Sequence, residues 1–145
     1  MSAYLIGQKG LLRSGGRTCC PCQDSGGLQT PKSARFTNED GEFVFLNLDE
    51  IENNLDELSS TYPNIFTEKF SIGESLEGRN IWAIKVSDNP NINENEPEML
   101  YTGLHHAREP MSYMNLFYFM NWLTENYGID PEATALVNSR ELYFI

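Results

Sequence analysis

The amino-acid sequence predicts an α/β protein in which helices cover both faces of a sheet. Two observations support this class. Stretches with helical periodicity alternate with short strand-like stretches, and residues 81–86 are almost continuously apolar, as expected of a buried strand. A length of 145 residues suits one domain, and contents of 40% hydrophobic and 21% charged residues are those of a globular protein.

The first ordered element is predicted to be an amphipathic helix that begins after Asn47, a residue type that caps helices well. Asp49 and Glu50 suit the positive end of the helix dipole. Residues 62–64 contain a proline and should end the helix. The apolar stripe repeats at steps of three and four residues and consists of Leu48, Ile51, Leu55 and Leu58.

Strand-like stretches follow at about residues 67–72, 80–86 and 98–104. Gly73 and Gly78 predict a turn between the first two stretches. Residues 88–98 are polar and include two prolines, so an exposed loop is expected there.

The last third of the chain is predicted to hold two helices and a strand. The first helix runs from Pro110 to about Tyr127, and apolar residues cover most of its circumference, so it should be largely buried. Asp130 is positioned to cap a short second helix over residues 131–138. Residues 141–145 have the pattern of a strand.

Residues 1–40 differ from the rest in composition and predict a loop-rich or disordered leader. Its three cysteines cannot pair fully and lack a second cysteine pair that would complete a zinc site, so we interpret them as exposed thiols. They are Cys19, Cys20 and Cys22.

The charge distribution excludes some partners. Residues 1–35 hold five basic residues and one acidic residue, a net charge of +4. Since the whole chain has a net charge of −11, residues 36–145 carry a net charge of −15. So acidic a body argues against nucleic-acid binding. No secretory signal is visible at the N-terminus, and no apolar run is long enough to span a membrane.

A candidate metal pair lies where the third strand-like stretch meets the long helix. His106 and Glu109 are three residues apart, and a turn into a helix would point both side chains the same way. Imidazole and carboxylate are both zinc ligands. The alternative to a metal site is a surface histidine beside a solvated acidic residue at the start of a helix, and the spacing alone does not exclude it.

The string Thr-Gly-Leu-His-His-Ala-Arg-Glu-Pro, residues 102–110, resembles the zinc motif of metallocarboxypeptidases of the carboxypeptidase A and T type. Residues 72–79, about thirty positions upstream, resemble the Ile-Gly-x-Ser-x-Glu-Gly-Arg turn of the same family. The resemblance implies a mixed-sheet α/β/α zinc-carboxypeptidase fold. Residues 41–145 would form the N-terminal part of that catalytic domain, and the chain is expected to stop after about its first third.

The resemblance also implies roles for particular residues. His106 and Glu109 would hold one Zn²⁺ ion, and Arg108 would help to bind a peptide or protein substrate at its C-terminus. Arg108 has a structural alternative, pairing with one of the many acidic residues. Adjacent side chains on an extended backbone point apart, so His105 is expected to pack or to support the ligands. By analogy with bacterial relatives, the resemblance implies secretion.

The family's third zinc ligand, general base and carboxylate-binding arginines lie downstream of the motif, so no catalytic residue is expected within this chain. Two ligands bind zinc poorly, and we expect the isolated chain to be inactive as a peptidase. An alternative is a non-catalytic truncated fragment or binding module of the same fold. Another is a related zinc amidohydrolase acting on acylated amino acids, which the full His-Ala-Arg-Glu string disfavours.

Overall fold

The computed structural model describes residues 44–145. The predicted leader, residues 1–40, lies outside the described residues, as does its cysteine cluster of Cys19, Cys20 and Cys22. The elements alternate as predicted, and in chain order they are α1 (Leu48–Thr61), β1 (Phe70–Glu74), β2 (Asn80–Val86), β3 (Glu98–Tyr101), α2 (Met111–Asn126), α3 (Pro131–Asn138) and β4 (Glu141–Phe144).

The four strands form one mixed sheet in the order β1-β2-β4-β3. β2 pairs antiparallel with β1 and with β4, whereas β3 and β4 run parallel. The chain passes from β3 to β4 through α2 and α3, which is the kind of crossover that a parallel pair requires. The mixed sheet confirms the predicted fold class.

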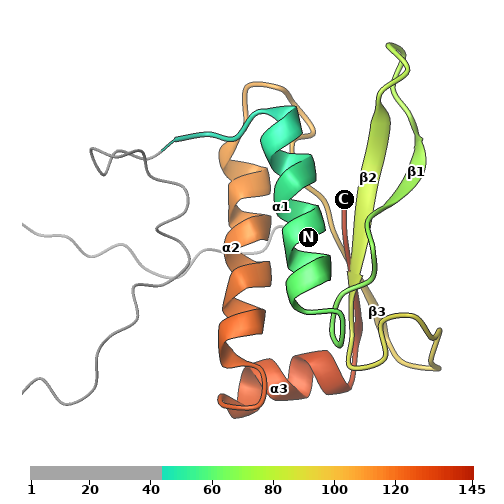
Figure 1. Cartoon of the computed structure of the whole chain (residues 1–145), viewed down its shortest axis with the longest axis vertical. Coiled ribbons are helices and arrows are strands. Elements are labelled where there is room, and N and C mark those ends of the chain that lie inside the picture. The colour runs from blue at the N-terminus through green and yellow to red at the C-terminus, as the bar shows by residue number, and fades with distance from the viewer. Residues whose placement is uncertain (1–43) are drawn as a thin grey trace, which may run out of the picture.

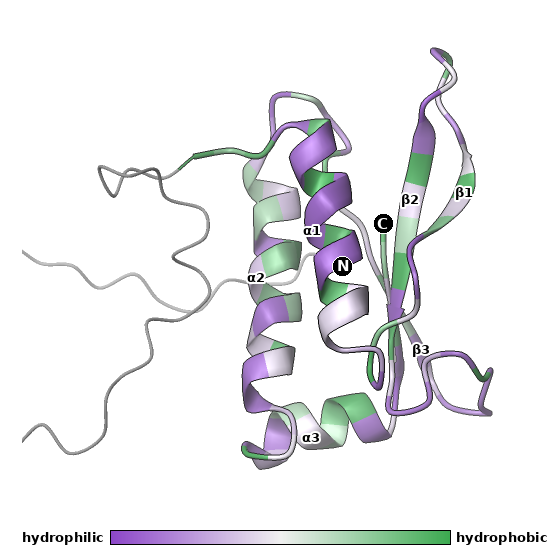
Figure 2. Ribbon diagram, in the orientation of Figure 1, coloured by the Kyte–Doolittle hydropathy of each residue, from purple (hydrophilic) through white to green (hydrophobic). Residues whose placement is uncertain are grey.

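α1 and α2 lie side by side on one face of the sheet, and α3 crosses near the ends of the strands (Figure 1). Hydrophilic and hydrophobic bands alternate along α1, whereas the middle of β2 is hydrophobic (Figure 2). Leucines of α1 and aromatic and aliphatic residues of α2 pack against β2 and β4. Buried apolar members of this core with at most 2% exposure include Phe66, Ile84, Val86, Met120, Leu123, Ala133, Val137 and Leu142.

The opposite face of the sheet has no helix within residues 44–145, so the predicted helical cover of both faces is found on one face only in this part of the chain (Figure 1). Instead, the loop between β2 and β3 covers part of it. Lys85 and Glu141 lie under this loop, with side-chain exposures of 6% and 0%, and form an ion pair of 3.0 Å. The Lys85 ammonium donates to the Ile92 carbonyl at 2.6 Å, and the Glu94 amide donates to Glu141 at the same distance. The loop predicted to be exposed is therefore anchored to a buried charge pair.

Other differences from the expected elements have local causes. The first strand begins at Phe70 rather than near residue 67, and its register shifts between Ser71 and Gly73. β3 ends at Tyr101 because the next residues turn into the motif loop. α2, predicted to be largely buried, exposes two large apolar residues: Met111 in its first turn, at 51%, and Tyr118, at 57%.

Candidate metal centre

The motif occupies the loop of residues 102–110, which follows β3 and leads into α2. The loop lies at the carboxyl end of β3, the edge at which α/β sheets place their ligand sites. Pro110 is the N-cap residue of α2, with helical backbone angles, so the helix begins one residue after the motif. The predicted helix began at Pro110 itself, so the observed start is one residue later.

The backbone of the loop is constrained at its start. A Cβ atom added to Gly103 would lie 3.0 Å from the Cα and N atoms of Tyr113, so only glycine allows the loop to approach α2 this closely. Leu104 has a φ of 51°, in the left-handed region that costs a residue with a side chain about 1–2 kcal/mol. Contacts of the loop with neighbouring residues must offset this conformational cost.

His106 and Glu109 are joined by a turn, in which the Glu109 amide donates to the His106 carbonyl at 2.9 Å. Both side chains are exposed. Within residues 44–145, neither the His106 ring nor the Glu109 carboxylate has a hydrogen-bond or ion-pair partner. No contact within residues 44–145 therefore prevents the His106 imidazole and the Glu109 carboxylate from coordinating a metal ion.

The two flanking candidates are also exposed. His105 does not pack in the core; its Nε2 atom lies 3.1 Å from the Thr102 hydroxyl oxygen. The backbone bends at His105 and His106, so the extended geometry assumed from the sequence is wrong here. Arg108 forms no ion pair with an acidic residue of the described part of the chain.

The donor chemistry of His106 and Glu109 fits zinc, since imidazole nitrogen and carboxylate oxygen are its usual ligands beside thiolate. These residues supply two ligands. A catalytic zinc takes three protein ligands, and within residues 44–145 no third histidine, cysteine or acidic group joins these two in a cluster.

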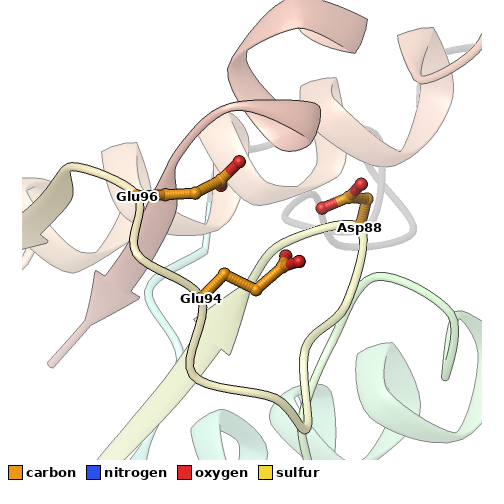
Figure 3. Close-up of side chains that lie close together, drawn as sticks. All are labelled: Asp88, Glu94 and Glu96. Atoms are coloured by element: carbon orange, nitrogen blue, oxygen red, sulfur yellow. The ribbon is translucent and has the colours of Figure 1, made fainter.

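A different set of donors gathers at the opposite end of β3. Asp88, Glu94 and Glu96 converge in the β2–β3 loop, with ligand atoms within 4.8 Å of one another (Figure 3). Burial, and then the charges of Glu94, Asp88 and Glu141, raise the pKa of Glu96. An all-carboxylate set suits a hard cation such as Ca²⁺ rather than zinc. Like-charged side chains alone do not define a metal site.

Two features of the molecule were missed by sequence reasoning. The Lys85–Glu141 pair joins residues far apart in the chain, and its sequence signal is one charged residue in each of two largely apolar strands, within β2 and at the start of β4. The Ser112 hydroxyl accepts from the Leu104 amide at 2.6 Å and donates to the Glu109 carbonyl at 2.7 Å. A serine in the first turn of a helix is too common to have been singled out.

Comparison with known proteins agrees with this architecture. The sequence profile described as zinc carboxypeptidase matches residues 51–145. A zinc carboxypeptidase of Saccharothrix mutabilis subsp. capreolus is 36% identical over 99 residues, and carboxypeptidase A1 of Bos taurus is 33% identical over 110 residues. The crystal structure of thrombin activatable fibrinolysis inhibitor superimposes with a TM-score of 0.63 over 79% of this chain, at 23% identity, which shows a shared fold.

The chain belongs to the zinc carboxypeptidase family. The match to the Saccharothrix protein covers 68% of this chain and 23% of that protein. The chain covers 25% of bovine carboxypeptidase A1 and 29% of the superimposed structure. It therefore spans about a quarter of the length of these relatives. No helix among residues 44–145 has the length and apolar character needed to cross a membrane.

Proposed function

We propose that this chain supplies two zinc ligands, His106 and Glu109, of a metallocarboxypeptidase that removes C-terminal residues from peptides or proteins. One observation carries the proposal. In a chain of the zinc carboxypeptidase family, these two side chains come from one turn at the carboxyl end of β3 and have no competing partner within residues 44–145. Secretion, which the family resemblance implies, belongs to the same proposal.

Each residue has a distinct task in this proposal. A zinc ion, when bound, supplies an activated water and polarises the peptide carbonyl. His106 and Glu109 hold the ion, and Arg108 directs its guanidinium to an oxygen of the substrate, a task for which its fork of donors is suited. The lack of an acidic partner for Arg108 within residues 44–145 supports this role.

The proposal also limits what the chain does alone. The family resemblance implies that the third ligand and the general base lie downstream of residues 102–110, so the 145-residue chain alone should not hydrolyse peptides. The alternative is a non-catalytic truncated fragment or binding module of the same fold. The lack of a third donor beside His106 and Glu109 within residues 44–145 is compatible with it. Metal-dependent release of C-terminal residues by the purified chain would contradict the predicted inactivity.

Zinc binding tests the proposal. We would measure bound Zn²⁺ per chain by equilibrium dialysis, with Cys19, Cys20 and Cys22 changed to serine so that thiols do not compete. One weakly held ion is expected. His106→Ala and Glu109→Ala should each abolish binding, because one remaining ligand cannot retain zinc.

His105→Ala is the matched control, since it removes the neighbouring imidazole and should leave binding unchanged. Equal binding by the thiol-free chain and the His106→Ala variant would refute the assignment. Binding that depends on His105 but not on His106 would refute it as well.

A further inference from the structure

The motif loop, residues 102–110, is not part of a helix or strand at either end. Leu104 adopts an unfavourable left-handed backbone conformation near the start of the loop, and Glu109 lies near its end. The N-cap residue of α2, Pro110, makes no side-chain capping hydrogen bond. Regular secondary structure therefore does not secure the residues between Leu104 and Glu109.

The Ser112 side chain spans these two ends. Its hydroxyl accepts a hydrogen bond from the Leu104 amide at 2.6 Å and donates one to the Glu109 carbonyl at 2.7 Å. A hydroxyl has one donor and two acceptor sites, so it can make both bonds at once. The Ser112 amide also donates to the Glu109 carbonyl, at 3.1 Å. The same residue thus satisfies the strained amide of Leu104 and fixes the peptide unit of Glu109.

The contacts of Gly103 reinforce this arrangement. Its amide donates to the Ile145 carbonyl at 2.9 Å, and its Cα packs against the backbone of Tyr113, the residue after Ser112. The start of the loop is therefore held between the end of β4 and the first turn of α2. His106 lies in the chain between Leu104 and Glu109, the two residues that the Ser112 hydroxyl bonds.

We propose that Ser112 is a positioning residue for the zinc pair, whose hydroxyl closes the motif loop and sets the relative orientation of His106 and Glu109. The inference rests on the proposed zinc-binding function. Ser112 bonds the backbone that carries the ligands and not the ligand side chains themselves. Loss of a partner bonded directly to a ligand weakens metal binding by about 10–100-fold, so the effect of Ser112 is expected at the lower end of that range.

The test compares Ser112→Ala and Ser112→Thr in the thiol-free full-length chain, with two readouts. Hydrogen exchange of the Leu104 amide reports on the loop without metal, and equilibrium dialysis reports zinc affinity. Ser112→Ala should accelerate Leu104 exchange and weaken zinc binding by about 10-fold. Ser112→Thr keeps a hydroxyl and should restore both. Ser59→Ala, which removes a hydroxyl from α1 far from the loop, is the control and should change neither.

The outcomes separate the inference from the proposed function. Absence of zinc binding by the parent chain would contradict both. Zinc binding by the parent that Ser112→Ala leaves unchanged would overturn the positioning role alone. Equal losses in Ser112→Ala and Ser112→Thr would also overturn it, because the hydroxyl would then not be the group that matters.

Discussion

At the scale of single residues, the Lys85–Glu141 pair beneath the β2–β3 loop is a buried ion pair, with side-chain exposures of 6% and 0%. Burial alone would raise the pKa of Glu141, but hydrogen bonds from the Glu94 amide, Lys85 and Tyr143, with the positive charge of Lys85, lower it. Burial, and then the hydrogen bond and charge of Glu141, raise the pKa of Tyr143 to about 12. The ionised form of Glu141 is thus the one that the fold favours.

Replacing Glu141 by Gln should lower the free energy of unfolding at pH 7 by about 3–5 kcal/mol, because Lys85 would remain buried without its counter-charge. The lowered pKa means that the stabilisation is present above the ordinary pKa of Glu141 and is lost as pH falls through the folded-state value. Urea unfolding at several pH values should therefore show the two proteins converging in acid.

Asp56→Asn is the control for this prediction. It breaks the ion pair of Lys69 with Asp56, whose side chain is 59% exposed, and should cost no more than about 1 kcal/mol. Similar losses in the two variants would contradict the special role of the buried pair. So would a loss in Glu141→Gln that does not change between neutral and acidic pH.

At the scale of elements, local signals were sufficient where one segment determines its own structure. The predicted capping of α1 by Asn47 is confirmed, and Glu50 completes a capping box. Asp130 caps α3 through the amides of Glu132 and Ala133, also as predicted. β2 has the predicted bounds, because a run that is apolar except for Lys85 lies between polar residues on both sides.

The sequence was less informative where distant segments decide the outcome. The start of β1 depends on its pairing with β2 and on the irregularity at Gly73, neither of which periodicity reveals. Gly103, two residues after the end of β3, fits closely against Tyr113, a contact between two elements that the sequence pattern does not reveal. For the same reason the position of residues 102–110 between a strand and a helix was predictable from the local sequence, whereas the hydroxyl of Ser112 that links the loop ends was not.

The cap of α1 offers a test of the helical layer. Asn47→Ala removes the acceptor for the Glu50 amide and should lower the free energy of unfolding by about 1 kcal/mol, with Asn47→Ser close to the parent. Tyr113 of α2 donates to the carbonyl of Leu46, so the cap also adjoins the contact between the helices. Chemical denaturation measures the change.

Asn54→Ala provides a matched control within the same helix. The substitution is identical but falls in the helix interior, where alanine is the better helix former, so stability should not fall. Destabilisation by Asn54→Ala equal to that by Asn47→Ala would contradict the capping account.

At the scale of the whole molecule, the sheet face without a helix carries exposed apolar surface. Leu100 is 63% exposed on β3, which is an edge strand in the described sheet, and its strand partner Tyr143 lies beside it. Edge strands with apolar side chains and free backbone groups are sites of association.

We therefore expect the purified chain to self-associate, and Leu100→Lys to shift it toward monomer in sedimentation velocity. Ile129→Lys is the control: Ile129 is 81% exposed but lies in the turn between α2 and α3, away from the sheet edge. An equal effect of both substitutions would attribute association to general hydrophobicity, and a monomeric parent chain would contradict the prediction outright.

The central claim, that His106 and Glu109 form a zinc-binding pair, is tested most directly by NMR of the two histidine rings during a Zn²⁺ titration of the thiol-free chain. The ring resonances of His106 should shift and saturate with one ion per chain, and those of His105 should change little. The His106 shifts should disappear in Glu109→Ala. Equal responses of the two rings, or His106 shifts that survive Glu109→Ala, would contradict the claim.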